Sequence, residues 1–176
     1  MNRFRFGAVV SGLAIIALIS PSSARVTQTD LLVAGRALGF INNLKRGDVR
    51  VGIVYDPGRA QSAQQANEFA AAMAGGFRVG SAVLHPVTLS IGEMAGANVD
   101  VLLLTAGLGA EAAEAGRVSR ARKLPCLTFD LAQVRNAVCA MGVRSNPKIE
   151  VIVNRAAAKA SGLDLAAAFR LLITEI

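Results

Sequence analysis

The segment VGIVYDPGRAQSAQQANEF, residues 51–69, decides the fold. It begins as an apolar run of strand length, breaks at Tyr-Asp-Pro-Gly, and continues into an alanine-rich stretch with helical spacing. Asp-Pro-Gly supplies the turn, and Ser62 is placed to cap the helix that follows. A strand that leads directly into a helix is the unit of a parallel sheet, and ligands are commonly held at that junction.

Strands and helices alternate on both sides of this segment. Apolar runs bounded by turn residues predict strands at 49–55, 77–87, 99–105, 125–129, 137–143 and 148–153. Helical spacing predicts helices at 31–44, from 61 or 62 to 74, and at 110–122, 131–135, 155–160 and 163–173. Thr29 and Asp30 are the expected caps of the first helix, and Asn154 that of the penultimate one.

This order predicts a single three-layer α/β domain with a mostly parallel central sheet of about five or six strands. Arg-Ser-Asn-Pro at 144–147 is typical of a hairpin turn, so we expect a C-terminal antiparallel hairpin followed by a terminal helix. Pro86 cannot donate a hydrogen bond to a neighbouring strand, so its part of the strand is expected at an edge.

The first 24 residues have the pattern of a Sec-type signal peptide. Two arginines precede an apolar run at 7–19, and a Ser-x-Ala ending follows it. A permanent membrane span needs about 20 apolar residues, which this run lacks. We expect cleavage after Ala24, which leaves residues 25–176 as one periplasmic domain; a retained N-terminal anchor is the alternative.

The chain is basic, with a formal net charge of +7 from 19 Lys and Arg against 12 Asp and Glu. The basic residues are scattered and aromatic residues are scarce, which argues against nucleic-acid binding. The densest basic cluster, at 117–123, is interpreted as the solvated face of a helix.

Cys126 and Cys139 are the two cysteines of the chain. An exported protein meets an oxidising compartment, so a disulfide between them is permitted. Both lie in expected strands, and we favour two buried thiols while leaving the bridge open as the alternative.

The usual signatures of catalysis and cofactor binding are missing from the sequence. Its single histidine, His85, has no triad partner nearby and is interpreted as structural, and no metal-ligand spacing or P-loop occurs. Gly107 and Gly109 superficially resemble a dinucleotide loop, but the third glycine is misplaced and Glu111 follows in the helix. We therefore expect a non-enzymatic protein with no catalytic residue, no metal and no cofactor; an exported hydrolase is the least favoured class.

Three loops should meet at the carboxyl ends of the parallel strands, at 56–62, 105–109 and 130–133. That edge is the usual ligand-binding edge of such sheets, and helix N-termini there offer free N–H groups. The alternative is that these residues serve only the turns. The candidate ligand-binding residues are Asp56, Ser62, Thr105, Gly107 and Asp130.

The C-terminal sequence KIEVIVNRAAAKASGLDLAAAFRLLITEI resembles YfiR-type periplasmic proteins, which close with an INL-AA--AGL-----LL-LA pattern. Val-Asn-Arg at 153–155, the alanines at 156–158, Gly-Leu at 162–163 and the two leucines at 171–172 match it. The Trp-Pro usual before the first strand is absent, with Lys-Arg at 45–46 instead. The resemblance implies a small α/β regulator that binds an inner-membrane protein such as a diguanylate cyclase.

Residues 51–73 also look like the opening of one lobe of an ABC-transporter substrate-binding protein. Such proteins hold the ligand between two lobes, and this chain is long enough for one. The leading hypothesis is an exported, non-enzymatic YfiR-like protein that acts through contacts with an envelope or inner-membrane protein. The alternative is a one-lobed solute-binding protein, which would need a partner or a homodimer for tight capture.

Overall fold

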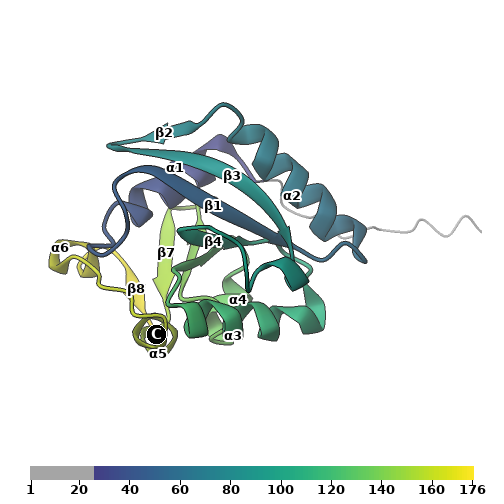
Figure 1. The fold of residues 1–176 in the computed structure, drawn as a ribbon. Helices are drawn as coiled ribbons and strands as arrows, with labels where there is room; N and C mark the ends of the chain where they lie inside the picture. The colour runs from purple at the N-terminus through teal and green to yellow at the C-terminus, as the bar shows by residue number, and fades with distance from the viewer. Residues whose placement is uncertain (1–25) are drawn as a thin grey trace, which may run out of the picture.

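The computed structural model describes residues 26–176. The predicted signal peptide and its cleavage after Ala24 therefore lie outside the described residues. These form one eight-stranded sheet, in the order β2-β3-β1-β4-β5-β6-β7-β8 (Figure 1). The strands are β1 (Gly47–Tyr55), β2 (Phe77–Val79), β3 (Ala82–Ser90), β4 (Val101–Leu104), β5 (Cys126–Thr128), β6 (Met141–Arg144), β7 (Glu150–Val153) and β8 (Thr174–Glu175).

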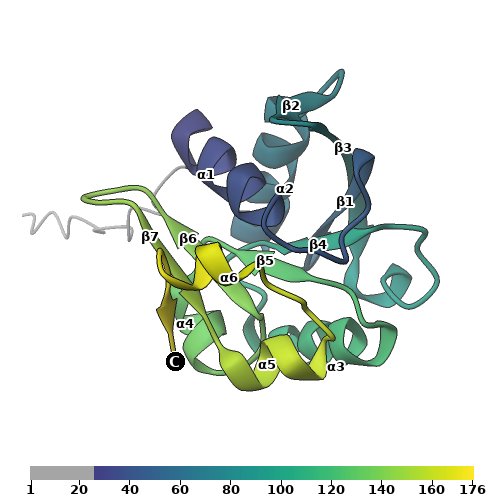
Figure 2. The same cartoon turned by 90° about the vertical axis from the view of Figure 1, so that its left-hand side faces the viewer.

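Helices cover both faces of this sheet, which makes three layers (Figures 1 and 2). The α-helices are α1 (Gln28–Leu38), α2 (Ala60–Ala72), α3 (Ala112–Arg122), α4 (Leu131–Arg135), α5 (Arg155–Ala160) and α6 (Ala167–Arg170). Two short 3₁₀ turns, η1 (Ile91–Glu93) and η2 (Gly109–Glu111), complete the set. α1 and α2 lie on one face, and α3 and α4 lie on the other.

The centre of the sheet is parallel, as the sequence predicts. β3, β1, β4, β5 and β6 run in one direction, whereas β2 is antiparallel to β3 and β7 is antiparallel to β6. The predicted α/β fold with its C-terminal hairpin is therefore confirmed. The strand count exceeds the expected five or six because the region at 77–87 divides into the β2–β3 hairpin and the chain end adds β8.

The second half of β1, residues 51–54, is apolar and buried because helices cover both of its faces. Val49, Val51 and Ile53 belong to the core cluster that includes residues of α1 and α2, and Val54 belongs to the cluster that includes residues of α3. Pro86 lies in β3 beyond the three residues of β3 that pair with β2, so that part of β3 is an edge, as expected.

The start of α1 corrects the predicted cap. Thr27 is the N-cap: its side chain accepts a hydrogen bond from the Asp30 N–H, and the Asp30 carboxylate accepts one from the Thr27 N–H at 2.8 Å. This reciprocal capping box starts the helix at Gln28, and Thr29 lies inside its first turn. The helix ends at Leu38, earlier than the predicted 31–44, and a loop leads to β1.

Ser62 does not cap α2. The N-cap is Arg59, whose side chain makes no capping hydrogen bond, and Ser62 lies in the first turn. Ser62, Ala66 and Phe69 are the buried residues of α2, at the spacing of a single helical face. The Ser62 hydroxyl therefore turns toward the sheet, where it has partners.

The predicted terminal helix exists but is much shorter than the predicted 163–173. The backbone at 164–166 is held extended against the loop after α1, because Asn42 donates to the Asp164 carbonyl at 2.8 Å and Ala166 donates to the Phe40 carbonyl at 2.9 Å. Only α6 remains helical, and the last residues pair with β7 as β8. The predicted Asn154 cap of α5 is confirmed, since its side chain accepts from the Ala157 N–H.

Candidate functional site

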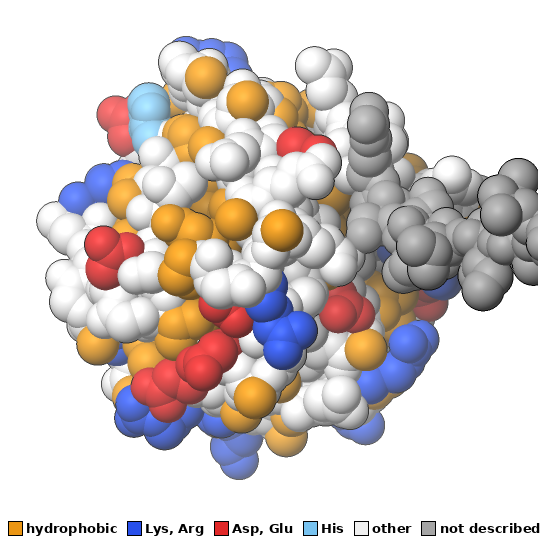
Figure 3. Space-filling model, turned by 90° about the vertical axis from the view of Figure 1, so that its right-hand side faces the viewer, with side chains coloured by type: hydrophobic (Ala, Val, Ile, Leu, Met, Phe, Trp, Pro, Cys, Tyr) orange, Lys and Arg blue, Asp and Glu red, His pale blue; other side chains and the backbone are white. Residues whose placement is uncertain are grey.

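The order of the strands reverses between β1 and β4. After β1 the chain continues to β3 on one side, and it then crosses to β4 on the other side of β1. In open α/β sheets, ligands bind outside the carboxyl ends of the strands at such a reversal. The loops that follow β1, β4 and β5 meet at this edge, which Figure 3 shows from outside; acidic and basic side chains lie next to each other near its centre.

Ser62 and Thr105 are fully buried at this edge and bond to each other. Their hydroxyl oxygens are 2.6 Å apart. Thr105 donates to the Val54 carbonyl at 2.9 Å, and the Ser62 oxygen accepts the Asp56 N–H at 3.0 Å. This chain of hydrogen bonds clamps the start of α2 to the ends of β1 and β4, so both hydroxyls serve the scaffold. Contact of either hydroxyl with a ligand stays a prediction.

Asp56 shapes the turn that follows β1. One carboxylate oxygen accepts the Gly58 N–H at 2.8 Å, and the other lies 3.3 Å from the Arg59 guanidinium. This is an Asx turn closed by an ion pair, and it uses both oxygens. Gly107 has a φ of +78°, a conformation that favours glycine, so its place in the β4 loop follows from the backbone. A ligand role for Asp56 and Gly107 likewise stays a prediction.

Asp130 is the predicted residue whose carboxylate remains partly available. Its Oδ1 accepts the Ala132 N–H at 2.9 Å and caps α4. Its Oδ2 has no hydrogen-bond partner within residues 26–176, and Asp130 lines a cavity at this edge of about 340 Å³. We call this the carboxyl-edge cavity; it is lined by Val26, Thr27, Asp30, Gln61, Gln65, Ala106, Phe129, Asp130, Val143, Arg144 and Asn146.

Most of this lining was not foreseen from the sequence. Gln65 follows Gln61 by one helical turn, a spacing that would have placed both on one side of α2. The Gln65 side chain accepts the Ala106 N–H at 2.5 Å, which joins α2 to the β4 loop. Asp30 and Arg144 come from α1 and the β6 end, and no local signal in the sequence connects them with the loops.

Asp30 adds a second carboxylate to the cavity, but its oxygens are engaged. Burial raises the pKa of Asp30, whereas hydrogen bonds from Ser145 and Thr27 lower it, and the net pKa lies below the ordinary value. The Ser145 N–H donates to its Oδ1 at 3.1 Å, which ties the β6–β7 turn to α1. Asp30 is therefore ionised at neutral pH and contributes negative charge to the cavity wall.

Gln133, at the end of the third predicted loop segment, is buried beside the same edge. Its amide donates to the Thr105 carbonyl at 2.9 Å, while its Oε1 has no hydrogen-bond partner within the described residues. The α4 segment is thereby joined to the end of β4, so all three predicted loop segments come together as expected.

Cys126 and Cys139 form a disulfide with a Cα–Cα distance of 5.1 Å. The favoured prediction of two buried thiols is therefore wrong, and the alternative, a disulfide, is confirmed. The reason is the pairing of β5 with β6, in which Leu127 lies opposite Met141. This pairing brings Cys126, the first residue of β5, close to Cys139, two residues before β6. Ala137 has a φ of +55° and turns the chain after α4, so β6 starts later than the predicted 137–143. The bridge lies in the core beside α3, not in the cavity.

His85 lies at the opposite edge of the sheet. Its Nε2 is 3.0 Å from the Asp48 carboxylate, and neither residue lines the carboxyl-edge cavity. Among residues 26–176, no group of three or more His, Cys, Asp or Glu side chains is arranged to hold a metal ion. Within the same range, none of the helices has the length and apolar character needed to cross a membrane.

Comparison with protein families and with curated proteins gives no match. Comparison with solved structures does. The chain is similar to a substrate-binding protein with adhesive properties from Clostridium difficile, solved in its ligand-free open form, with a TM-score of 0.55 and 13% sequence identity. It is also similar to a conserved domain protein from Vibrio cholerae, with a TM-score of 0.56 and 14% identity.

Both likenesses cover 81% of this chain but only 59% and 58% of the other two chains. The chain therefore spans less than two thirds of the proteins that it resembles. At these identities the likeness concerns the fold. The similarity to part of a substrate-binding protein agrees with the one that residues 51–73 suggested.

Proposed function

We propose that this protein is an exported, non-enzymatic binding protein that holds a small solute in the carboxyl-edge cavity. The observation that carries the proposal is the position of this cavity. It lies at the carboxyl ends of the strands, beside the reversal between β1 and β4, in a fold similar to part of a substrate-binding protein. A YfiR-like protein that acts through protein contacts is the second candidate.

The lining favours a solute that carries an amine together with a small apolar group. Asp130 offers Oδ2 to a cation, Asp30 adds negative charge, and the positive charge of Arg144 in the lining is paired with Glu150. Phe129 and Val26 supply apolar surface, and the Asn146 amide has no hydrogen-bond partner within residues 26–176. Amino acids and related small amines combine these properties.

A single lobe leaves one side of such a solute in water. The bound solute would then be held weakly unless a second copy or a membrane partner covers the cavity. A periplasmic location is part of the proposal, and two features support it: the N-terminal sequence pattern and the disulfide, which is typical of oxidising compartments.

Replacing Asp130 with asparagine is expected to remove most of the ligand-induced stabilisation and leave the fold intact. Asparagine caps helices as well as aspartate does, so α4 keeps its cap while the cavity loses a charge. The measurement is a thermal-shift screen of amino acids, small amines, small anions and sugars, because a ligand that binds the folded state raises Tm by mass action.

Asp164→Asn is the matched control, since Asp164 is exposed and does not line the cavity. The expected pattern is a Tm increase with an amine-bearing solute in the wild type and in Asp164→Asn, and a much smaller one in Asp130→Asn. A screen without any shift, or shifts of equal size in all three proteins, would argue against solute binding at this cavity.

The second candidate is a YfiR-like regulator that acts through protein contacts. The observation that favours it is the C-terminal turn, where Leu171 and Leu172 are 87% and 72% exposed. Large side chains so open to water are common where another protein binds. These leucines belong to the segment that resembles YfiR-type proteins, and an inner-membrane partner of the diguanylate cyclase type is part of this candidate.

Changing Leu171 and Leu172 together to serine is expected to abolish recovery of an envelope protein after mild crosslinking and affinity capture. Because both side chains are mostly in water already, the fold should lose little stability. Ile149→Ser, at another exposed apolar residue, is the control. Equal recovery with both variants would exclude the C-terminal leucines as the contact, and no recovery with the wild type would remove this candidate.

A further inference from the structure

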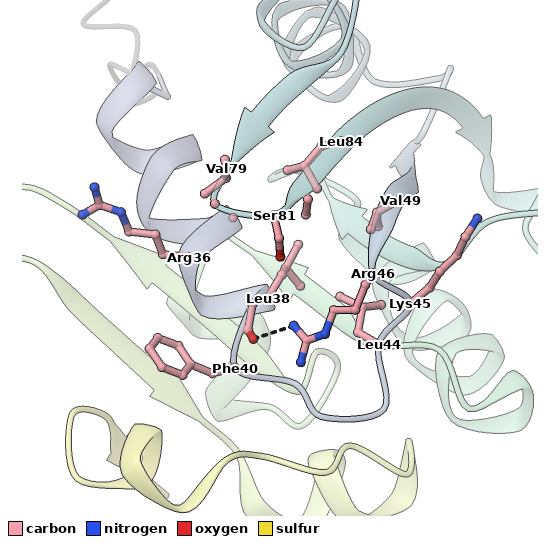
Figure 4. Close-up of a pocket in the computed structure, with 14 residues that line it drawn as sticks. Arg36, Leu38, Phe40, Leu44, Lys45, Arg46, Val49, Val79, Ser81 and Leu84 are labelled. Atoms are coloured by element: carbon pink, nitrogen blue, oxygen red, sulfur yellow. Dashed lines mark hydrogen bonds between the residues drawn. The ribbon is translucent and has the colours of Figure 1, made fainter.

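A second cavity opens at the other edge of the sheet, at the amino ends of β1 and β3 (Figure 4). Its volume is about 290 Å³. The walls come from the last turns of α1, the loop that follows it, the start of β1 and the β2–β3 turn. We call it the amino-edge cavity; it shares no lining residue with the carboxyl-edge cavity.

The floor of the amino-edge cavity is apolar. Leu38, Val49 and Leu84 lie at its base and are at most 4% exposed. α1 contacts β2 directly beside it, because a Cβ built on Gly35 would lie 2.6 Å from the Val79 Cγ2. The cavity is thus a hollow in a closely packed wall, and apolar matter placed there is removed from water.

The charge around this hollow has one sign. Arg36, Lys45 and Arg46 line it, and no Asp or Glu is present among the described residues that do so. Figure 4 shows the Arg46 side chain directed into the cavity, whereas those of Arg36 and Lys45 extend away on either side. The nearby carboxylate of Asp48 is paired with His85 instead.

Arg46 is held in position by the protein. Its Nη1 donates to the carbonyl of Gly39, the C-cap residue of α1, at 2.9 Å, and this bond fixes one side of the guanidinium. The remaining N–H groups of Arg46 have no partner within residues 26–176. Ser81, in the β2–β3 turn, adds a hydroxyl to the same lining (Figure 4).

We propose that the amino-edge cavity binds a small monocarboxylate with an apolar body, of the medium-chain fatty acid or arylcarboxylic acid class. The guanidinium fork matches the two oxygens of a carboxylate, and the apolar floor accepts the hydrocarbon part. A volume at the lower end of the range for ligand sites limits the body to a small one. The proposal is independent of solute binding at the carboxyl edge.

Arg46→Gln is the central test, with octanoate as the ligand and the chain expressed from its complete sequence. Octanoate is expected to shift the backbone amide NMR signals of Gly39, Gly80 and Ser81. Arg46→Gln should weaken binding about tenfold or more, because a charge-assisted hydrogen bond is lost. Arg78→Gln, at an exposed arginine of β2 outside the lining, should bind octanoate as the wild type does.

The neutral match, 1-octanol, separates carboxylate recognition from simple apolar binding. For the wild type, octanol should bind at least about tenfold more weakly than octanoate. For Arg46→Gln, octanol and octanoate should bind with equal affinity. Arg46→Lys keeps the charge without the fork and should fall between the wild type and Arg46→Gln. It also serves as the test if Arg46→Gln does not fold.

Three results would overturn the proposal. They are equal binding of octanoate and octanol to the wild type, octanoate binding weaker than about 10 mM, and octanoate-induced shifts confined to the carboxyl edge, for example at Gln65 and Ala106. The last result would assign the carboxylate to the other cavity.

Discussion

Phe69→Ala is expected to lower the free energy of unfolding by about 3–5 kcal/mol. Phe69 is the largest buried side chain of α2 and is 1% exposed. Its ring lies 5.4 Å from that of Phe129, which lines the carboxyl-edge cavity. The other residues of α2 that face the sheet are small, so no neighbour on the helix can fill the hole that alanine would leave.

Phe40→Ala is the matched control for this loss. Phe40 stacks on Phe169 with ring centroids 4.6 Å apart, but it is 36% exposed. Its truncation should cost about 1 kcal/mol, since it loses a ring pair but creates no enclosed void. Urea unfolding followed by circular dichroism gives both values. Similar losses for the two variants would show that Phe69 is not the anchor of α2.

The double variant Cys126→Ala/Cys139→Ala is expected to lose about 3 kcal/mol of stability and roughly 6–12 °C in Tm. The bridge closes a loop with a sequence separation of 13 residues. It joins the start of β5 to the turn before β6, two short strands that pair over only two residues. Without it, the unfolded chain gains freedom and these strands lose their covalent tie.

Chemical reduction distinguishes the stability that the covalent bridge provides from the stability that the packing of the sulfur atoms provides. Dithiothreitol should lower the Tm of the wild type toward that of the double variant and leave the double variant unchanged. Thiol titration of the unreduced, denatured protein should find no free thiol. Two free thiols, or a Tm that reduction does not change, would exclude a stabilising bridge.

The fold follows from local sequence where a strong pattern meets a clear break. The run at 51–55 with Asp-Pro-Gly after it predicts β1, its turn and α2, because strand period, turn residues and helical spacing agree. Predictions failed where the chain end carries helical spacing but tertiary contacts hold it extended. The backbone hydrogen bonds that Asn42 and Ala166 donate to distant residues decide the conformation of that segment. No short stretch of sequence contains both partners of these bonds.

The candidate site shows the same division. That the loops after β1, β4 and β5 meet follows from the parallel order of the strands. The role of each side chain at this edge does not follow from the order of the strands. Ser62 and Thr105 have the residue types of a ligand site, yet their hydroxyl groups bond to each other, with the two oxygens 2.6 Å apart. Asp130 keeps an oxygen available because only one of its two oxygens caps α4.

The sequence by itself determined the layer order, the parallel centre, the C-terminal hairpin and the edge at which loops gather. These depend on periodicity and turn chemistry, which act between residues a few positions apart. Only the tertiary structure decided the disulfide, the position of the chain end, the lining residues of the carboxyl-edge cavity and the amino-edge cavity with Arg46. Each of these joins side chains that are distant in sequence, and their separations are set by packing.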